Sequence, residues 1–151
     1  MTVHNRRYAN AVKAAAIAGI GFTAVVLIGV AVMFYSGQKE PMVSVSGNNV
    51  RIDAMYGLTI DAADIAFVSL IEKSMNDMGP GRRTNGYGFG DTLKGHCYYE
   101  SLGNVLVFVK TGSSPTICIE RGGDKDVYIS FGDGEKTKEL YRELIEVIPS
   151  K

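Results

Sequence analysis

The stretch AAAIAGIGFTAVVLIGVAVMFY, residues 14–35, contains no charged residue and divides the chain into two unequal parts. A helix rises about 1.5 Å per residue, so a helix over this stretch would be about 33 Å long. That length is enough to cross the roughly 30 Å hydrocarbon core of a bilayer. The sequence therefore predicts a short basic tail over residues 1–13, a transmembrane helix over 14–36, a linker over 37–41 and one folded domain over 42–151.

A cleaved signal peptide is the main alternative for the apolar stretch, because basic residues precede it. The stretch is, however, about twice as long as a typical signal-peptide core, and its end, residues 32–36, lacks the small-x-small pattern of a cleavage site. The Arg6–Arg7 pair suggests a twin-arginine export signal, but Tyr8-Ala9-Asn10 fits that consensus poorly. We therefore expect an uncleaved, single-pass anchor.

The distribution of basic residues predicts the orientation of this anchor. Arg6, Arg7 and Lys13 precede the apolar stretch, whereas only Lys39 follows it closely. Since Lys and Arg are enriched on the cytoplasmic side, the N-terminus is expected in the cytoplasm and the C-terminal domain outside the cell membrane.

Small residues recur at every fourth position of the anchor, at Ala11, Ala15, Gly19 and Thr23. On a helix these positions share one ridge, along which a second helix can approach closely. The ridge predicts a homodimer through the anchor, although helices rich in Ala and Gly also show such spacing by composition alone.

The composition narrows the class of partner. Sixteen basic and sixteen acidic residues give a formal net charge of zero, so the basic surface of a nucleic-acid-binding protein is missing and no nucleic-acid partner is expected. The chain has eighteen Gly and no Trp, and this composition is typical of short strands joined by tight turns.

Alternation of apolar and polar residues predicts a small antiparallel meander in the first half of the domain. A turn at residues 46–49 separates two expected strands, and a longer apolar strand closes the meander after Asp64. The expected strands cover residues 42–46, 50–54, 56–60 and 65–72.

The second half is predicted to form another antiparallel sheet of four consecutive hairpin-connected strands. Residues 76–91, rich in Gly, Asn and Arg, are expected to be a loop or an irregular strand. The four expected strands cover residues 96–101, 105–110, 116–121 and 127–131.

Helical periodicity appears only near the C-terminus. Apolar residues lie on one face of the expected helix, with Asp133 as its N-cap and Pro149 as its end. This apolar face should cover one opening or face of the sheets. The residues of that face are Leu140, Tyr141, Leu144, Ile145 and Ile148.

Residues 43–147 resemble a bacterial pleckstrin-homology-like (PH-like) domain. The similarity is carried by residues 55–60 (MYGLTI), 83–90 (RTNGYGFG) followed by 93–96 (LKGH), and 107–109 (VFV). The resemblance implies a mainly β fold, a barrel or sandwich of about seven antiparallel strands capped by a C-terminal helix, with no enzymatic activity. The first hairpin lacks the basic residues that lipid-binding members use for phosphoinositides.

The glycine-rich block, residues 79–90, is the strongest candidate for a ligand site. Its backbone amides and guanidinium groups suit an anion, and the candidate ligand-binding residues are Arg82, Arg83, Asn85 and Lys94. The alternative is that its glycines form bulges and tight bends at a corner of the sheet.

The remaining chemistry-bearing residues predict neither a metal site nor catalysis. His96 is the only histidine outside the N-terminal tail, and the acidic residues near 124–135 lack the spacing of a calcium loop. Cys97 and Cys118 are expected two strands apart, about 9.6 Å, which is too far for a disulfide. We expect two buried free thiols, no cofactor and no catalytic residue.

Two functions are compatible with this sequence. The first is a non-catalytic, membrane-anchored interaction module that binds a protein or peptide at a sheet edge or in the groove beside the helix. The second is a sensor of small anions or lipid headgroups that uses the Gly/Arg-rich loop.

Overall fold

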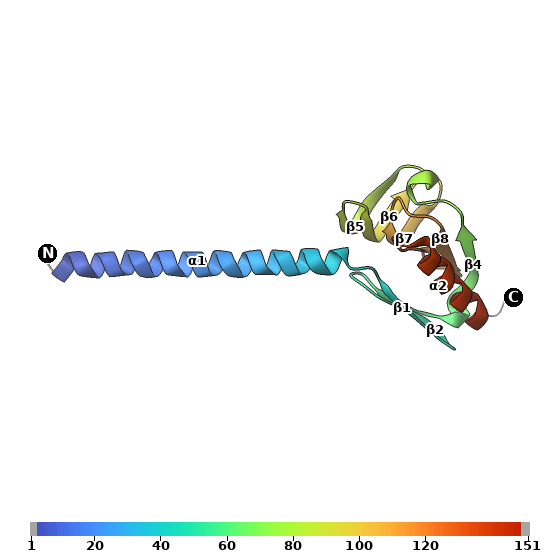
Figure 1. The fold of residues 1–151 in the computed structure, drawn as a ribbon, viewed down its shortest axis with the longest axis horizontal. Coiled ribbons are helices and arrows are strands. Elements are labelled where there is room, and N and C mark those ends of the chain that lie inside the picture. Colours follow the sequence, from blue (N-terminus) through green and yellow to red (C-terminus); the bar gives the residue numbers. More distant parts are fainter. Residues whose placement is uncertain (1–2, 149–151) are drawn as a thin grey trace. The chain divides into compact units, whose positions relative to one another are not determined.

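The computed structural model describes residues 3–148, and the side chains from Tyr8 onward. The chain separates after Ser36 into two compact units. The first consists of helix α1 (Val3–Gln38) without its last residues (Figure 1). Its segment Tyr8–Gln38 is long and apolar enough to cross a membrane, and large side chains such as Ile17, Phe22 and Leu27 are exposed. The helix also includes the residues before Ala14, since the Ala-containing segment 8–13 favours helix.

A three-stranded antiparallel sheet follows, in the order β1 (Met42–Ser46), β2 (Asn49–Asp53), β3 (Leu58–Asp61). The expected hairpin is confirmed, because Ser46 pairs with Asn49 across the two-residue turn. The meander ends at β3, contrary to expectation. A 3₁₀ turn η1 (Ala62–Asp64), in which Asp61 accepts a hydrogen bond from the Ala63 amide at 3.0 Å, directs β4 (Ile65–Ile71) into the other sheet.

The second sheet has six strands in the order β4-β8-β9-β7-β6-β5. The expectation of consecutive hairpins is wrong here, because β9 lies between β7 and β8 and runs parallel to β7. All four residues of β9 are buried, so this strand requires neighbours on both edges and cover on both faces. Besides β4, the strands of this sheet are β5 (Gly81–Phe89), β6 (Thr92–Tyr99), β7 (Gly103–Lys110), β8 (Thr116–Arg121) and β9 (Val127–Ser130).

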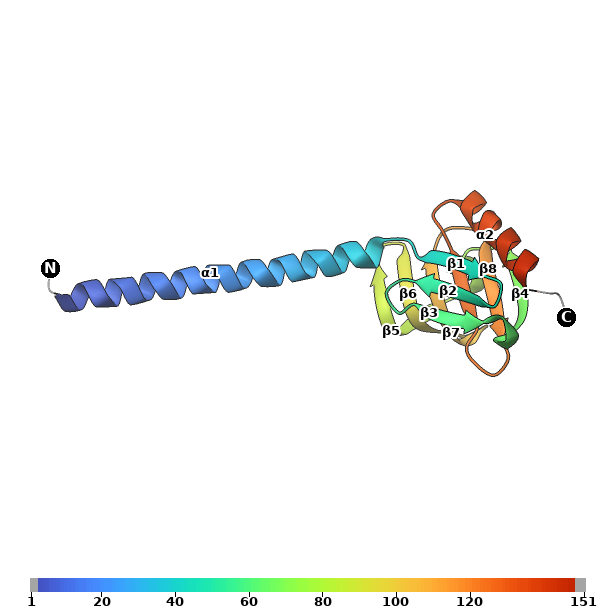
Figure 2. The same ribbon diagram turned by 90° about the horizontal axis from the view of Figure 1, so that it is seen from below.

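The described strands number nine, not about seven, and the β7–β9 pair is not antiparallel. The coarser prediction of a strand-rich domain with a C-terminal helix holds. The two sheets stack face to face, and β1–β3 cross the strands of the larger sheet in Figure 2. Apolar residues of both sheets, such as Ile52, Ile60, Phe108 and Ile119, form one core between them.

Helix α2 (Gly134–Val147) contacts β1 from one sheet and β4, β8 and β9 from the other, and so closes one opening between the sheets (Figure 2). Leu140, Leu144 and Ile148 are buried as expected, but Ile145 is 44% exposed because the buried stripe is narrower than the predicted face. The predicted cap is confirmed, since the Asp133 side chain accepts a hydrogen bond from the Glu135 amide at 2.9 Å. Pro149 lies outside the described residues.

The opposite face of the six-stranded sheet is covered by the segment between β4 and β5. This segment contains a short 3₁₀ helix, η2 (Asn76–Met78), and Met75 with no exposed surface. The Asn76 amide donates to the Thr111 carbonyl at 3.0 Å, and the Ser101 hydroxyl donates to the Met78 carbonyl at 2.8 Å. Residues 76–78, expected to belong to a loop or an irregular strand, therefore help to complete a second apolar core.

The glycine-rich block forms strand β5, and its register shifts at residues 83–85. Gly86 pairs with Gly95, and both have positive φ, 159° and 109°. A Cβ at Gly95 would lie 2.6 Å from the Asn85 carbonyl oxygen and 2.8 Å from the Gly86 Cα. The structural interpretation is therefore supported for Gly86, which together with Gly95 permits a close approach of two backbones.

Cys97 and Cys118 are free and buried, as predicted. The strand order places them farther apart than expected, since β7 and β9 both lie between β6 and β8. Burial raises the pKa of both thiols, that of Cys118 to about 11 despite its hydrogen bond with Tyr128. Both cysteines are components of the second core.

Candidate functional site

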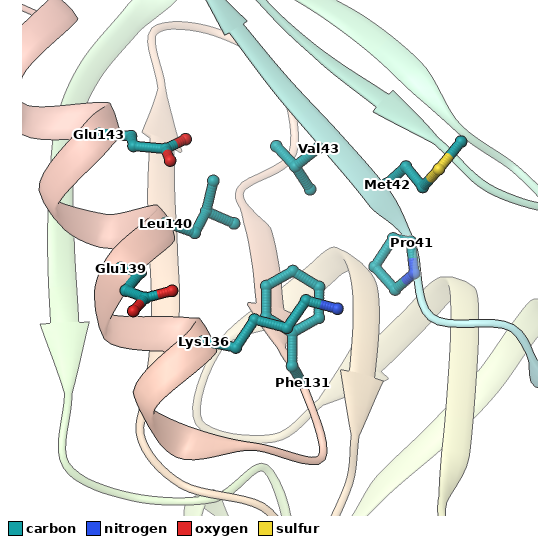
Figure 3. Close-up of a pocket in the computed structure, with 8 residues that line it drawn as sticks. All are labelled: Pro41, Met42, Val43, Phe131, Lys136, Glu139, Leu140 and Glu143. Carbon is teal, nitrogen blue, oxygen red and sulfur yellow. The ribbon is translucent and has the colours of Figure 1, made fainter.

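An open groove of about 320 Å³ lies between the start of β1 and residues 136–143 of α2 (Figure 3). Pro41, Met42 and Val43 line it on the strand side. The helix side contributes Lys136, Glu139, Leu140 and Glu143, and Phe131 lies between the two sides. We call this feature the β1–α2 groove.

The β1–α2 groove has an apolar floor and a charged rim. Phe131 and Leu140 are 3% and 6% exposed, and Val43 is half-buried beside them. Glu139 and Glu143 are exposed on α2, and Figure 3 shows both carboxylates extending from the helix toward the groove. Such a surface can bury apolar side chains of a ligand while its rim contacts polar ones.

The strand beside the groove has an unpaired edge. β1 is the outer strand of its sheet, and the Ser46–Asn49 pair closes its two-residue hairpin. This closing pair is hydrogen-bonded, so by alternation the amide and carbonyl groups of Val43 and Val45 point away from β2. Among residues 3–148, no other strand pairs with these groups.

One end of the groove is fixed by a contact between α2 and the segment that precedes β1. Glu40 accepts hydrogen bonds from Lys136 Nζ at 2.6 Å and from the Gly132 amide at 2.8 Å. The Lys136 ammonium also lies 4.3 Å from the centroid of the Phe131 ring. Burial acts to raise the pKa of Glu40, but these hydrogen bonds and the charge of Lys136 outweigh it and lower the pKa.

Residues 37–41, expected to be a linker, are packed into the domain. The Thr92 hydroxyl donates to Gln38 Oε1 at 2.7 Å, and the Lys94 ammonium donates to the Lys39 carbonyl. A Cβ at Gly37 would lie 2.3 Å from the Tyr87 ring, so this glycine allows the aromatic side chain to pack against the backbone. The position of Pro41 at the groove is therefore set by these contacts before it in the sequence and by the pairing of Met42 with Asp53 after it.

The structure does not bring the four predicted ligand-binding residues together. Lys94 is 2% exposed and lies inside the domain, where burial and the nearby charge of Lys110 lower its pKa. Arg82 lies over the Tyr98 ring at 5.5 Å, on one face of β5. Arg83 is on the other face of β5, because it pairs with the buried Cys97 whereas Arg82 pairs with the exposed Tyr98. Asn85 pairs with His96 along the same hairpin.

Aromatic residues of β5 and β6 are divided between surface and core. Phe89 and Tyr98 are 54% and 37% exposed, whereas Tyr99 is 4% exposed and belongs to the second core. Tyr98 also lines a shallow surface pocket with Arg82 and Glu100. These residues do not form the β1–α2 groove.

The sequence predicted a groove beside the helix but not its lining. Glu139 and Glu143 lie outside the predicted apolar face of the C-terminal helix, and Pro41 belongs to the predicted linker. The four-residue spacing of the two glutamates was visible, but nothing local showed that this part of α2 faces β1.

Comparison with known proteins assigns neither a family nor a function to this chain. No family model, no curated protein and no solved structure matches the chain.

Proposed function

We propose that this chain is a non-catalytic, single-pass membrane protein whose domain binds an extended segment of a partner protein in the β1–α2 groove. The observation that carries the proposal is the coincidence of an unpaired strand edge with an apolar-floored groove. An extended peptide laid along β1 would form an added strand and place alternate side chains over the groove.

The membrane part of the proposal rests on α1. The apolar segment of this helix is longer than the hydrocarbon core of a bilayer is thick. Its large apolar side chains are exposed, and such a surface needs an apolar environment. With the helix as an uncleaved anchor in the cell membrane, the N-terminus is cytoplasmic and the domain extracytoplasmic. A reporter fused after Lys151 tests the orientation, and activity of a cytoplasmic reporter alone would contradict it. The mass of the membrane-associated chain tests cleavage.

The backbone of β1 offers a defined amount of binding energy. Val43 and Val45 each present one donor and one acceptor, which gives four hydrogen bonds to an added strand. At about 1 kcal/mol net each, these supply about 4 kcal/mol, which corresponds to a Kd of about 1 mM. Contacts of the partner with the lining side chains that are still accessible, above all the 72% exposed Met42, must therefore provide the remaining affinity, because Leu140 and Phe131 are already nearly buried.

No observation favours the second function, an anion or headgroup sensor. Lys94 is turned into the domain toward the Lys39 carbonyl, and the two arginines lie on opposite faces of β5. Gly86 in this block has a structural role, the close approach of its backbone to that of Gly95. We therefore propose protein binding alone.

Peptide selection against the full-length chain in nanodiscs tests the proposal. A displayed library of extended peptides is selected on the wild type, and the enriched sequences are measured on a Val43→Pro variant. Proline removes the outward amide at this edge and blocks strand addition, so binding should fall at least tenfold.

Thr59→Pro is the matched control. Thr59 is exposed, and the register places its amide on the opposite edge of the same three-stranded sheet. This variant should keep binding within about twofold of the wild type. Enriched peptides that bind both proline variants equally well, or no enrichment at all, would overturn the proposed function.

A further inference from the structure

We infer that the β1–α2 groove selects extended peptide segments that contain two basic residues separated by one other residue. This inference rests on the proposed function and specifies its partner class. It follows from the charge on the groove rim and from the spacing of two carboxylates along α2.

The rim of the groove carries uncompensated negative charge. Three of its lining residues are charged in addition to the apolar ones: Lys136, Glu139 and Glu143. The ammonium of Lys136 is held by Glu40 at 2.6 Å. Within residues 3–148, neither Glu139 nor Glu143 has an ion-pair partner. A ligand in the groove therefore meets two carboxylates whose charge the domain leaves available.

The direction of these carboxylates makes them accessible to a ligand. Figure 3 shows Glu139 and Glu143 extending from α2 toward the side on which Val43 and Pro41 lie. Leu140, between them in sequence, points to the floor and is buried. A strand added to β1 would thus have an apolar surface beneath it and the two carboxylates along its far side.

The spacing of the carboxylates matches an extended chain. Four residues of α-helix separate Glu139 from Glu143, which is about 6 Å along the axis. Side chains on the same side of a strand recur every second residue, which is about 6.6 Å. Two basic residues with one residue between them would each face one carboxylate. A helical ligand would need its basic residues three or four positions apart.

The other end of the groove limits where the basic residues lie. The Lys136–Glu40 pair is close to neutral, and a third basic residue over it would face the Lys136 ammonium without a free carboxylate. The preference is therefore for one basic pair at the level of Glu139 and Glu143. Exposed ion pairs are weak singly, so each carboxylate should contribute about threefold in affinity and both together about tenfold.

Three capped peptides test the inference on the full-length chain in nanodiscs. Each alternates serine with valine, except that two successive serine positions are lysine in the first peptide, glutamate in the second and unchanged in the third. Affinity should follow the order lysine, serine, glutamate, and the preference should weaken as salt is added because exposed charges are screened. The paired substitution of Glu139→Lys and Glu143→Lys should reverse the order of the lysine and glutamate peptides.

Isosteric variants separate charge from folding. Glu139→Gln with Glu143→Gln should reduce lysine-peptide affinity about tenfold while leaving the serine peptide within about twofold. Glu120→Gln removes the same charge from an exposed residue on β8 that does not line the groove, and it should change neither peptide.

The outcomes distinguish the inference from the function on which it rests. If the three peptides bind equally well and Val43→Pro weakens all of them, strand addition stands and the basic preference is wrong. If Val43→Pro leaves the affinity of the lysine peptide unchanged but the Gln variants lower it, the charge attracts ligands without strand addition. The proposed function is then wrong. If Glu120→Gln lowers the affinity of the lysine peptide as much as the paired Gln variant does, the inference is also wrong, because nonspecific charge would then explain the binding.

Discussion

The carboxylate of Glu40 lies 2.6 Å from the ammonium of Lys136, although 96 residues separate them in the sequence. The contact joins the segment that precedes β1 to the first turn of α2, and both residues lie at the same end of the β1–α2 groove. The folded domain therefore includes residues that the sequence suggested were a linker.

Removal of residues 37–41 should destabilise the domain. A fragment of residues 42–151 lacks the hydrogen-bond partners of Thr92, Lys94, Gly132 and Lys136. Four such bonds at about 1 kcal/mol each predict a loss of about 4 kcal/mol relative to residues 37–151. Urea denaturation of both fragments measures this difference. A fragment that begins at Met33 serves as the control and should match residues 37–151; equal stability of all three would contradict the prediction.

Glu40→Gln should destabilise the domain by about 1 kcal/mol near neutral pH, because the variant loses the charge in two hydrogen bonds. The folded state lowers the pKa of Glu40 from its ordinary value of 4.5, so it binds fewer protons than the unfolded state. The stabilisation is thus present above the unfolded pKa and is lost as the pH falls through the folded value. Denaturation at several pH values should show the wild type and the variant converging in acid.

Glu146→Gln is the control for this experiment. Glu146 is exposed on the same helix, and its substitution should change the free energy of unfolding by less than about 0.5 kcal/mol at every pH. A gap between wild type and Glu40→Gln that stays constant into acid would show that packing, and not the charge, is responsible.

Gly95→Ala should destabilise the domain by about 3 kcal/mol or more. Its Cβ would overlap the Asn85 carbonyl and the Gly86 Cα, so the substitution adds a backbone collision to the cost of a positive φ. Gly90→Ala lies in the same hairpin, has φ 61° and has open space around its Cβ, so it should cost only about 1 kcal/mol. Equal losses in thermal denaturation would mean that the close approach of β5 and β6 is not required.

Gly19→Ile should weaken self-association of the anchor in a membrane dimerisation assay. Gly19 lies between Ala15 and Thr23 on the small-residue ridge, with nothing within 4 Å of its Cβ position, and the Thr23 hydroxyl bonds to the Gly19 carbonyl at 3.0 Å. A large side chain there would hold a second helix away. Gly21→Ile makes the same change on nearly the opposite side of the helix and should leave association intact. Unchanged association in Gly19→Ile would exclude a dimer through this ridge.

The strand prediction succeeded where local pattern determines structure. Residues 116–121 form β8 with the predicted bounds, and residues 42–46 form β1. Asp133 caps α2 because its side chain satisfies a nearby amide, which is also a local interaction. The pairing of strands was less predictable. Residues 111–115 could connect β7 and β8 as a hairpin, but in the structure β9 lies between these two strands.

For the candidate site too, local sequence showed which residue types are present but not which residues lie together. Arg82, Arg83 and Lys94 are close in sequence and carry the right charges, yet the alternation along β5 separates the arginines, and burial removes Lys94 from the surface. Glu139 and Val43 are distant in sequence but line one groove. No local signal links them, because their proximity depends on how α2 packs between the two sheets.

The sequence by itself determined the elements: an apolar helix of membrane-spanning length, a strand-rich domain and an amphipathic C-terminal helix. These follow from the period and length of apolar runs, which are properties of neighbouring residues. Only the tertiary structure decided that β9 lies beside β7, that residues 37–41 belong to the domain, and that a groove forms between β1 and α2. These depend on which apolar faces cover one another and which buried polar groups find partners, and both involve residues far apart in the chain.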